Sequence, residues 1–402
     1  MSISPDNSLK LVKMKRLLGL KVYEKKRSDC RLERSFAGSL YRESVCFANF
    51  GESSRQSWLF GLPLWGRKLQ DHKLQWHLGS SCVVNTLDIL GELAKDLDQL
   101  FAKESVKRVN GKKHVFVFWA NSGEIALLLA FFFEKLMKKQ GLTGKGDVVV
   151  LCTKKYHQEM LSFLFPEIPS VVAKPRGLRH LTDDADAGDW RIKMCFPGRY
   201  FAQLENTTRR PEGPKNYFAW MQEYFDCCTH FDGVCLRPEK KLLDAELSNA
   251  LKKLKISPEE LARTIILSPG SFSCGSLMNQ EVEMVRACVK EADLHLYCNP
   301  SDPKNEKFLT FPALYAAATQ AAGLIGIRSG LMDWLSLTGI PSFVVYRPFP
   351  DRGFNTPART IDEVFNMFSL RGLPNHSDNI LETSSINQAE LMVWVNSLRS
   401  HT

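Results

Sequence analysis

Residues 310–346 read TFPALYAAATQAAGLIGIRSGLMDWLSLTGIPSFVVY and contain two short apolar strands that alternate with helical segments. GLIGIR (323–328) and PSFVVY (341–346) have the continuous apolar character of parallel strands that are buried on both faces. Residues 313–322 and 331–339 are predicted helices. Helices that alternate with strands connect parallel strands by crossovers, so this stretch predicts a parallel sheet covered by helices.

The same alternation extends on both sides of this stretch. Two more strands are predicted at 264–270 and 294–300, and two more helices at 281–292 and 387–399. A helix start precedes them, with Ser257 as N-cap, Pro258 at the first helical position and Glu260 as the capping-box partner. The C-terminal third therefore predicts one Rossmann-like sheet.

A second alternating block lies earlier in the chain. Its predicted strands are HVFVFWA (114–120), DVVVLC (147–152) and SVVAKP (170–175). Its predicted helices are SGEIALLLAFFFEKLMKK (122–139) and HQEMLSFLF (157–165). Between the blocks, 177–190 is a predicted polar loop and 239–256 an exposed amphipathic helix. We therefore expect an α/β fold of GT-B-like architecture, with two Rossmann-like domains facing across a cleft. The predicted domains are a basic extension (1–78), an acceptor-side domain (79–235) and a nucleotide-sugar-binding domain (236–402).

The N-terminal extension is basic and contains an internal repeat. Residues 1–30 hold eight Lys or Arg residues against three acidic ones, so they contribute +5 of the chain's formal charge of +9. This segment is interpreted either as an arm that meets an anionic lipid surface or nucleic acid, or as a solvated tail. LLGLKVYEKK (17–26) and LFGLPLWGRK (59–68) each predict a short strand or hairpin edge, suited to a membrane interface or to packing on the main body.

Composition limits the function classes. The chain has 402 residues, of which 44% are apolar and 24% charged, as in ordinary globular proteins. The longest apolar run spans nine residues, 125–133, whereas a membrane-spanning helix needs about 20. The N-terminus lacks the pattern of a secretory signal. The eleven cysteines show no metal-site spacing and are expected to be reduced and mostly buried. These features predict a cytoplasmic protein, with peripheral membrane attachment left open.

Ligands of open parallel sheets bind beyond the carboxyl ends of the strands, so the loops that leave the strands are the candidate sites. The first loop contains Asn121, Ser122, Gly123 and Glu124. Glu124 lies in the first helical turn, where its carboxylate either acts as a general base for an acceptor hydroxyl or only complements the helix end.

Two loops of the C-terminal block are candidates for donor binding. The first contributes Ser268, Gly270 and Ser271, whose amides and hydroxyls suit a phosphate, although such residues are also common in turns. The second contributes Arg328, Ser329, Gly330, Leu331 and Asp333. Backbone amides at a helix start and a guanidinium suit a diphosphate, and Asp333 is interpreted as orienting Arg328 or capping the amides.

At these residues the chain resembles heptosyltransferase-type glycosyltransferases of the GT-B fold. Four short motifs carry the resemblance: Gly123-Glu124, Pro269-Gly270, Ser329-Gly330 and Gly339-Ile340-Pro341. The resemblance implies that Glu124 occupies the place of the family's aspartate base. Glu124 in place of Asp, and Arg328 in place of a small or acidic residue, are departures from the family, so no sugar is implied.

The chain also resembles glycosyltransferases of capsule and lipopolysaccharide gene clusters. This likeness rests on LFGLPLW (59–65), IGIRSGLMD (325–333) and MFSLRGL (367–373). It implies an acceptor that is a cell-surface glycan or a lipid-linked glycan.

Three further residues are candidates for the acceptor side. Arg199 and Tyr200 suit an anionic sugar or aromatic packing under a loop, and His157 suits an acceptor contact or a plain surface position. The DxD form at Asp184 and Asp186 has no preceding apolar strand, so we expect no metal.

These observations predict an inverting, metal-independent glycosyltransferase. Glu124 and Arg328 are its predicted catalytic residues, a nucleotide sugar is the co-substrate, and no cofactor or nucleic-acid partner is expected. Two alternatives stay open. One is an enzyme like the polysaccharide pyruvyltransferases, although the Arg-x-His pattern of that family is absent after Arg328. The other is a non-catalytic relative that binds a glycan or scaffolds an assembly.

Overall fold

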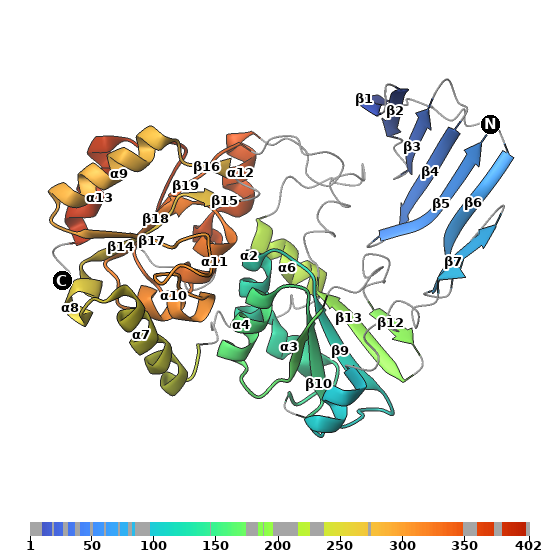
Figure 1. Cartoon of the computed structure of the whole chain (residues 1–402), viewed down its shortest axis with the longest axis horizontal. Coiled ribbons are helices and arrows are strands. Elements are labelled where there is room, and N and C mark those ends of the chain that lie inside the picture. Colours follow the sequence, from blue (N-terminus) through green and yellow to red (C-terminus); the bar gives the residue numbers. More distant parts are fainter. Residues whose placement is uncertain are drawn as a thin grey trace. The chain divides into compact units, whose positions relative to one another are not determined.

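The computed structural model describes residues 97–173, 184–195, 216–225, 237–348, 360–373 and 380–398, except 145, 188 and 272–274, together with the backbone of eight strands between residues 10 and 84 (Figure 1). The chain forms two compact units. The first comprises Met1–Trp119, Lys145–Thr153 and Pro169–Pro211, and the second comprises Ala120–Gly144, Lys154–Ile168 and Glu212–Thr402. The domain boundaries after residues 78 and 235 stay predictions.

The N-terminal strands form an antiparallel sheet in which each strand pairs with the next. They are β1 (Lys10–Leu17), β2 (Leu20–Lys26), β3 (Arg31–Phe36), β4 (Tyr41–Ala48), β5 (Gly51–Leu59), β6 (Leu62–Gln70), β7 (Lys73–Leu78) and β8 (Val83–Val84). The two repeats lie at equivalent hairpins, because Leu17 pairs with Leu20 and Leu59 with Leu62. The hairpin interpretation of the repeats is confirmed, and the basic residues at 10–17 and 20–26 are in strands, whether they meet a charged surface or only solvent.

The first unit also contains a mostly parallel sheet. Its strands are β9 (Lys113–Phe118), β10 (Val148–Cys152), β11 (Ser170–Val172), β12 (Asp184–Ala187) and β13 (Trp190–Cys195), in the order β11-β10-β9-β13-β12. Only β12 is antiparallel to its neighbour. The polar-loop prediction is wrong for 184–187, because the backbone of this segment pairs with β13 despite its polar sequence.

One face of this sheet packs against residues 97–103, which are helical. The rings of Phe101 and Trp190 meet edge to face at 5.2 Å. Val115 and Val117 of β9 belong to this apolar cluster. Phe116 points to the opposite face and is also buried, which explains why the strand is apolar from Val115 to Phe118.

The second unit is built on a parallel sheet in the order β17-β14-β18-β19-β20. The strands are β14 (Thr264–Ser268), β17 (His295–Cys298), β18 (Gly323–Ile327), β19 (Ser342–Val345) and β20 (Ile380–Thr383). The four predicted strands of this block are thus confirmed, and β20 was not predicted. The α/β fold class, with Rossmann-like parallel sheets, is confirmed.

Helices cover both faces of this sheet (Figure 1). On one face α9 (Asn279–Glu291) packs with α13 (Gln388–Leu398), and on the other α10 (Phe311–Ala318) packs with α7 (Lys240–Leu254) and α11 (Gly330–Ser336). The remaining helical elements of the C-terminal part are α8 (Pro258–Ala262), α12 (Ile361–Phe368) and the 3-10 turn η4 (Leu370–Gly372). The predicted capping box of α8 is present, and α7 buries only Ala250.

Three helical elements near the sheet's carboxyl edge complete the second unit. The predicted helix 122–139 is present as α2 (Ser122–Leu127), the π-helical η2 (Leu128–Phe132) and α3 (Phe133–Lys139), so the sequence pattern did not reveal its π-helical segment. The others are α4 (Lys155–Leu164) and α6 (Tyr217–Phe225). No helix in the described part of the chain is both long and apolar enough to span a bilayer.

Candidate functional site

The strand order of the second unit contains a topological switch point. β14 is the first strand of the sheet in the chain, β17 lies on one side of it, and β18 lies on the other. In doubly wound sheets of this order, ligands bind at the carboxyl ends of the two strands where the direction of winding reverses. The candidate site is therefore the edge where β14 and β18 end.

The two predicted donor loops leave the sheet side by side at this edge. Ser268, at the end of β14, pairs in register with Gly326 of β18. The strands approach so closely there that a Cβ atom on Gly326 would lie 2.3 Å from the Ser268 carbonyl oxygen. The structure thus brings together two segments that are about sixty residues apart in the sequence.

The first donor loop turns immediately into a small hairpin. Gly270 and Ser271 form β15, which pairs with β16 (Gly275–Ser276). A Cβ on Gly270 would lie 2.9 Å from the Ser276 Oγ atom. Ser268 is buried and Ser271 is half-buried. The hairpin fixes the backbone that follows β14.

The second donor loop begins α11. Ser329 is the N-cap, and its Oγ accepts a hydrogen bond from the Met332 N–H at 3.2 Å. Gly330 and Leu331 are half-buried. The Ser329 hydroxyl is therefore part of the helix cap, which leaves the backbone amides of the first turn as the donors that a phosphate would use.

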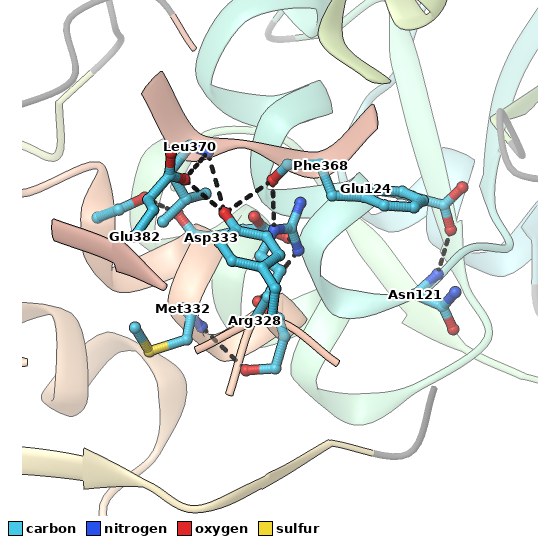
Figure 2. A network of polar contacts seen from close by, with 11 residues as sticks. Asn121, Glu124, Arg328, Met332, Asp333, Phe368, Leu370 and Glu382 are labelled. Carbon is cyan, nitrogen blue, oxygen red and sulfur yellow. Dashed lines mark hydrogen bonds and ion pairs between the residues drawn. The ribbon is translucent and has the colours of Figure 1, made fainter. Parts of the chain in front are cut away.

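Arg328 and Asp333 form a buried ion pair behind this helix start (Figure 2). One guanidinium nitrogen of Arg328, Nη1, donates to Asp333 Oδ2 at 2.7 Å, and Nε donates to the Phe368 carbonyl at 3.1 Å. Only 6% of Arg328 and 2% of Asp333 are exposed. The interpretation that Asp333 orients Arg328 agrees with this geometry.

The Asp333 carboxylate is incompletely satisfied. Its Oδ1 atom is buried and has no hydrogen-bond partner among the described residues. Burial raises the pKa of Asp333 to about 6, and the charge and hydrogen bond of Arg328 oppose this shift only in part. The pair therefore holds a carboxylate that titrates close to neutral pH.

The Phe368 carbonyl links Arg328 to a second polar cluster (Figure 2). The Tyr346 hydroxyl, whose single hydrogen points to the nearer acceptor Glu382 Oε1 at 2.5 Å, also lies 3.1 Å from the Phe368 carbonyl oxygen. Glu382 in turn accepts from the Leu370 N–H at 2.7 Å. The MFSLRGL segment, to which the sequence assigned no role, thus supports Arg328 from behind.

The predicted base loop forms the start of α2. Glu124 is 4% exposed, and its Oε2 accepts from the backbone N–H of Asn121 at 2.8 Å. This bond is half of a reciprocal capping box in which Asn121 is the N-cap. Glu124 thus caps its own helix, as one of the two sequence interpretations expected. Asn121 is exposed and Ser122 is half-buried.

The base loop and the second donor loop are in direct contact through two glycines. A Cβ atom on Gly123 would lie 1.9 Å from Asp333 Oδ2, and one on Gly330 would lie 2.1 Å from the Ser122 Oγ and 2.4 Å from the Gly123 nitrogen. No residue other than glycine fits at either position without moving one helix start away from the other. Two predicted loops more than two hundred residues apart therefore form a single site.

Two tyrosines lie near Glu124. The pKa of Tyr217 is raised well above its usual range, first by burial and then by the charge of Glu124 and a side-chain hydrogen bond with it. Burial and then the charge of Glu124 also raise the pKa of Tyr156, whose ring stacks on Phe311 at 5.4 Å. The sequence pattern singled out neither residue.

The remaining predicted residues divide into two groups. His157 is fully buried, with Nε2 3.2 Å from the Ala120 carbonyl oxygen, so the plain surface interpretation of His157 is wrong. Arg199 and Tyr200 lie outside the described residues. They follow β13, whose end at Cys195 pairs with the end of β9 at Phe118.

None of the protein-family models matches the sequence, and none of the curated proteins compared with it matches either. Three solved structures show a likeness to this chain. A family 9 glycosyl transferase from Veillonella parvula is 12% identical, with 74% of this chain and 100% of that chain covered and a TM-score of 0.46. The ADP-heptose lipopolysaccharide heptosyltransferase II of E. coli is 9% identical, with 72% and 100% covered and a TM-score of 0.45. The iron-containing dodecameric glycosyltransferase TibC of enterotoxigenic E. coli is 11% identical, with 90% and 94% covered and a TM-score of 0.40.

Proposed function

We propose that this chain is a glycosyltransferase that moves a sugar from a nucleotide-sugar donor to a glycan acceptor of the capsule or lipopolysaccharide type. The observation that carries the proposal is the contact of the base loop with the donor loop through Gly123 and Gly330. These are the loops in which the sequence predicted the base and the donor diphosphate. Their meeting beside a topological switch point supports a common reaction centre.

The donor diphosphate would bind where β14 and β18 end. Pro269 has no N–H, so the donors for phosphate oxygens would be the backbone amides of Gly270 and Ser271 and those in the first turn of α11. The bonds of Arg328 to Asp333 and Phe368 fix the plane of its guanidinium. A fixed positive charge near the departing diphosphate stabilises the negative charge that grows on it in the transition state.

Glu124 would act as the general base. Its Oε2 atom is held by the Asn121 N–H, and a carboxylate keeps further lone pairs for a second hydrogen bond. The acceptor hydroxyl would attack the anomeric carbon of the donor sugar as Glu124 takes its proton, while the bond from this carbon to the diphosphate oxygen breaks. A single displacement of this kind inverts the anomeric configuration.

A ligand screen tests the proposal. The purified chain is heated with UDP-, GDP-, ADP-, TDP- and CMP-sugars in EDTA, with phosphoenolpyruvate as a further candidate ligand. A ligand that binds only the folded state raises the melting temperature. One nucleotide class should stabilise the chain and release its nucleoside diphosphate in the presence of a glycan acceptor. A response to phosphoenolpyruvate alone would favour pyruvyl transfer, and binding without turnover would favour the non-catalytic relative.

A matched pair of variants locates the donor. Ser271, which is half-buried, and Ser276, which is exposed, lie on the two strands of the same hairpin. Ser271→Ala should weaken donor affinity about tenfold, because one hydrogen bond to a charged group is lost. Ser276→Ala should leave the affinity unchanged. Equal effects of the two substitutions would argue against a donor at this hairpin.

The membrane proposal is separate from the catalytic one. Basic residues of the extension occupy the paired strands β1 and β2, including Lys13, Lys15 and Lys25. Replacing these three lysines with glutamine should reduce sedimentation with anionic vesicles, since each basic residue near such a surface contributes about 1 kcal/mol. Unchanged sedimentation would discard the idea.

A further inference from the structure

Tyr217 is held in place by the aromatic packing of its helix. The Asn216 side chain begins α6 by accepting from the Phe218 N–H at 2.8 Å. The Phe218 ring lies 5.3 Å from that of Phe131 and 5.2 Å from that of Phe132, both in the π-helical segment η2. Because η2 directly continues α2, the start of α6 is fixed against the same helix that carries Glu124 in its first turn.

Tyr217 contacts both sides of the candidate site. Its hydroxyl is electrostatically coupled to Glu124, whose charge raises the pKa of Tyr217, and its ring lies 5.3 Å from that of Phe368. The Phe368 ring lies under the Arg328 guanidinium at 5.7 Å, and the Phe368 carbonyl accepts from Arg328 Nε. Two aromatic residues therefore connect the predicted base with the predicted donor arginine.

We propose that Tyr217 is a positioning residue, which holds the Glu124 carboxylate through its hydroxyl and sets it relative to Arg328 through its ring contact with Phe368. The inference rests on the proposed function, because it assigns Tyr217 to the same reaction centre. Burial and the charge of Glu124 raise the pKa of Tyr217, so its phenol is protonated at neutral pH and serves as the donor in this hydrogen bond. The capping bond holds one carboxylate oxygen, and Tyr217 adds a second constraint on the group.

The first test separates the hydroxyl from the ring. Tyr217→Phe removes the hydrogen bond and keeps the aromatic packing. Under the proposal, kcat falls about tenfold or more, because a hydrogen bond to a charged group is lost, while the donor KM stays within about twofold. Tyr224→Phe is the matched control, since Tyr224 is buried against Phe225 two turns further along the same helix. Equal kinetics for the two variants would overturn the proposal.

The second test needs no activity. The chain is labelled with 3-fluorotyrosine, and the fluorine resonance of Tyr217 is assigned by its absence in Tyr217→Phe. Glu124→Gln should move this resonance and lower the midpoint of its alkaline titration, because a neighbouring negative charge is removed. Glu134→Gln, at an exposed position of α3, should do neither.

Failure of the proposed function and failure of the Tyr217 inference give different results in these two tests. An absence of turnover in the unaltered chain, with every donor, would contradict the proposed function, while the fluorine resonance would still report whether Tyr217 holds Glu124. If Glu124→Gln changed neither the position nor the titration midpoint of the Tyr217 fluorine resonance, the inference would be overturned even in an active enzyme.

Discussion

The two helix starts at the candidate site, α2 and α11, place a buried acidic residue near their first turn in different ways. Glu124 bonds the backbone of its own N-cap, Asn121, three residues earlier. Asp333 bonds the Arg328 side chain, and that guanidinium depends in turn on the carbonyl of Phe368, forty residues later in the chain. The α2 start therefore contains its own capping partner, whereas the α11 start depends on distant residues.

This difference indicates that Glu124 is suited to proton transfer, whereas Asp333 is suited to stabilising the fold around Arg328. A carboxylate held by a backbone amide and by the proposed bond from Tyr217 keeps lone pairs that can accept a proton, and its helix cap survives replacement by an amide. A carboxylate that neutralises a buried guanidinium is needed for the integrity of the fold, because an unpaired buried charge is costly. Substitutions at the two positions should thus affect different quantities.

The largest effect is expected from Glu124→Gln. Glutamine also completes a capping box at the third helical position, so the melting temperature and donor affinity should stay near their original values. Loss of the base should lower kcat by about 10²–10⁴-fold. Steady-state kinetics and thermal unfolding of this variant and of Glu134→Gln make the comparison, and unchanged turnover would remove Glu124 from the mechanism.

Arg328→Ala should mainly reduce stability. The substitution leaves Asp333 buried without its partner and should lower the free energy of unfolding by about 3–5 kcal/mol, with weaker donor binding in addition. Urea denaturation measures the change in stability. Arg263→Ala is the control, because Arg263 pairs with Asp293 at the surface, where such pairs contribute roughly 0–1 kcal/mol. Similar losses in both variants would contradict the support role of the buried pair.

The glycine contact is expected to have a smaller effect. Gly123→Ala or Gly330→Ala should each lower the free energy of unfolding by about 1–3 kcal/mol, because the new methyl group overlaps the opposite helix start. Gly339→Ala controls for the loss of a glycine, since a Cβ there meets no atom within 4 Å and only the φ of +80° causes strain. Urea denaturation of the three variants is the measurement. If Gly123→Ala and Gly330→Ala lower the free energy of unfolding no more than Gly339→Ala does, the two loops do not approach each other as closely as described.

The pH dependence linked to Asp333 is the smallest effect. Its pKa in the folded chain is raised to about 6 from the ordinary 3.8, so its contribution to stability is fully present below the ordinary value and is lost as pH rises through the raised one. The stability of the unaltered chain relative to Asp333→Asn should fall by about 1 kcal/mol between pH 5 and 7.5. Urea denaturation at the two pH values measures it, and a constant difference would refute the shift.

Much of the fold could be predicted because the relevant signals are local. Continuous apolar runs predicted β9, β10, β14 and β18, and the Ser257 capping box predicted the start of α8. The strand β12 was missed because its sequence DADA contains only Asp and Ala, which are depleted in strands, and it is a strand only because β13 pairs with it. The π-helical turn at Leu128–Phe132 has no signal of its own in an apolar helix.

The positions of Glu124 and Arg328 just after buried parallel strands, where a ligand of such a sheet binds, could be predicted because strand ends and helix starts follow short-range patterns. The folded chain was needed to show that Gly123 packs too closely against Asp333 for a Cβ atom and that Tyr217 and Phe368 lie between Glu124 and Arg328. These contacts join residues that are tens to hundreds of positions apart. They depend on how close two helix starts come and on which side chains fill the remaining space, and no periodicity in the chain encodes either quantity.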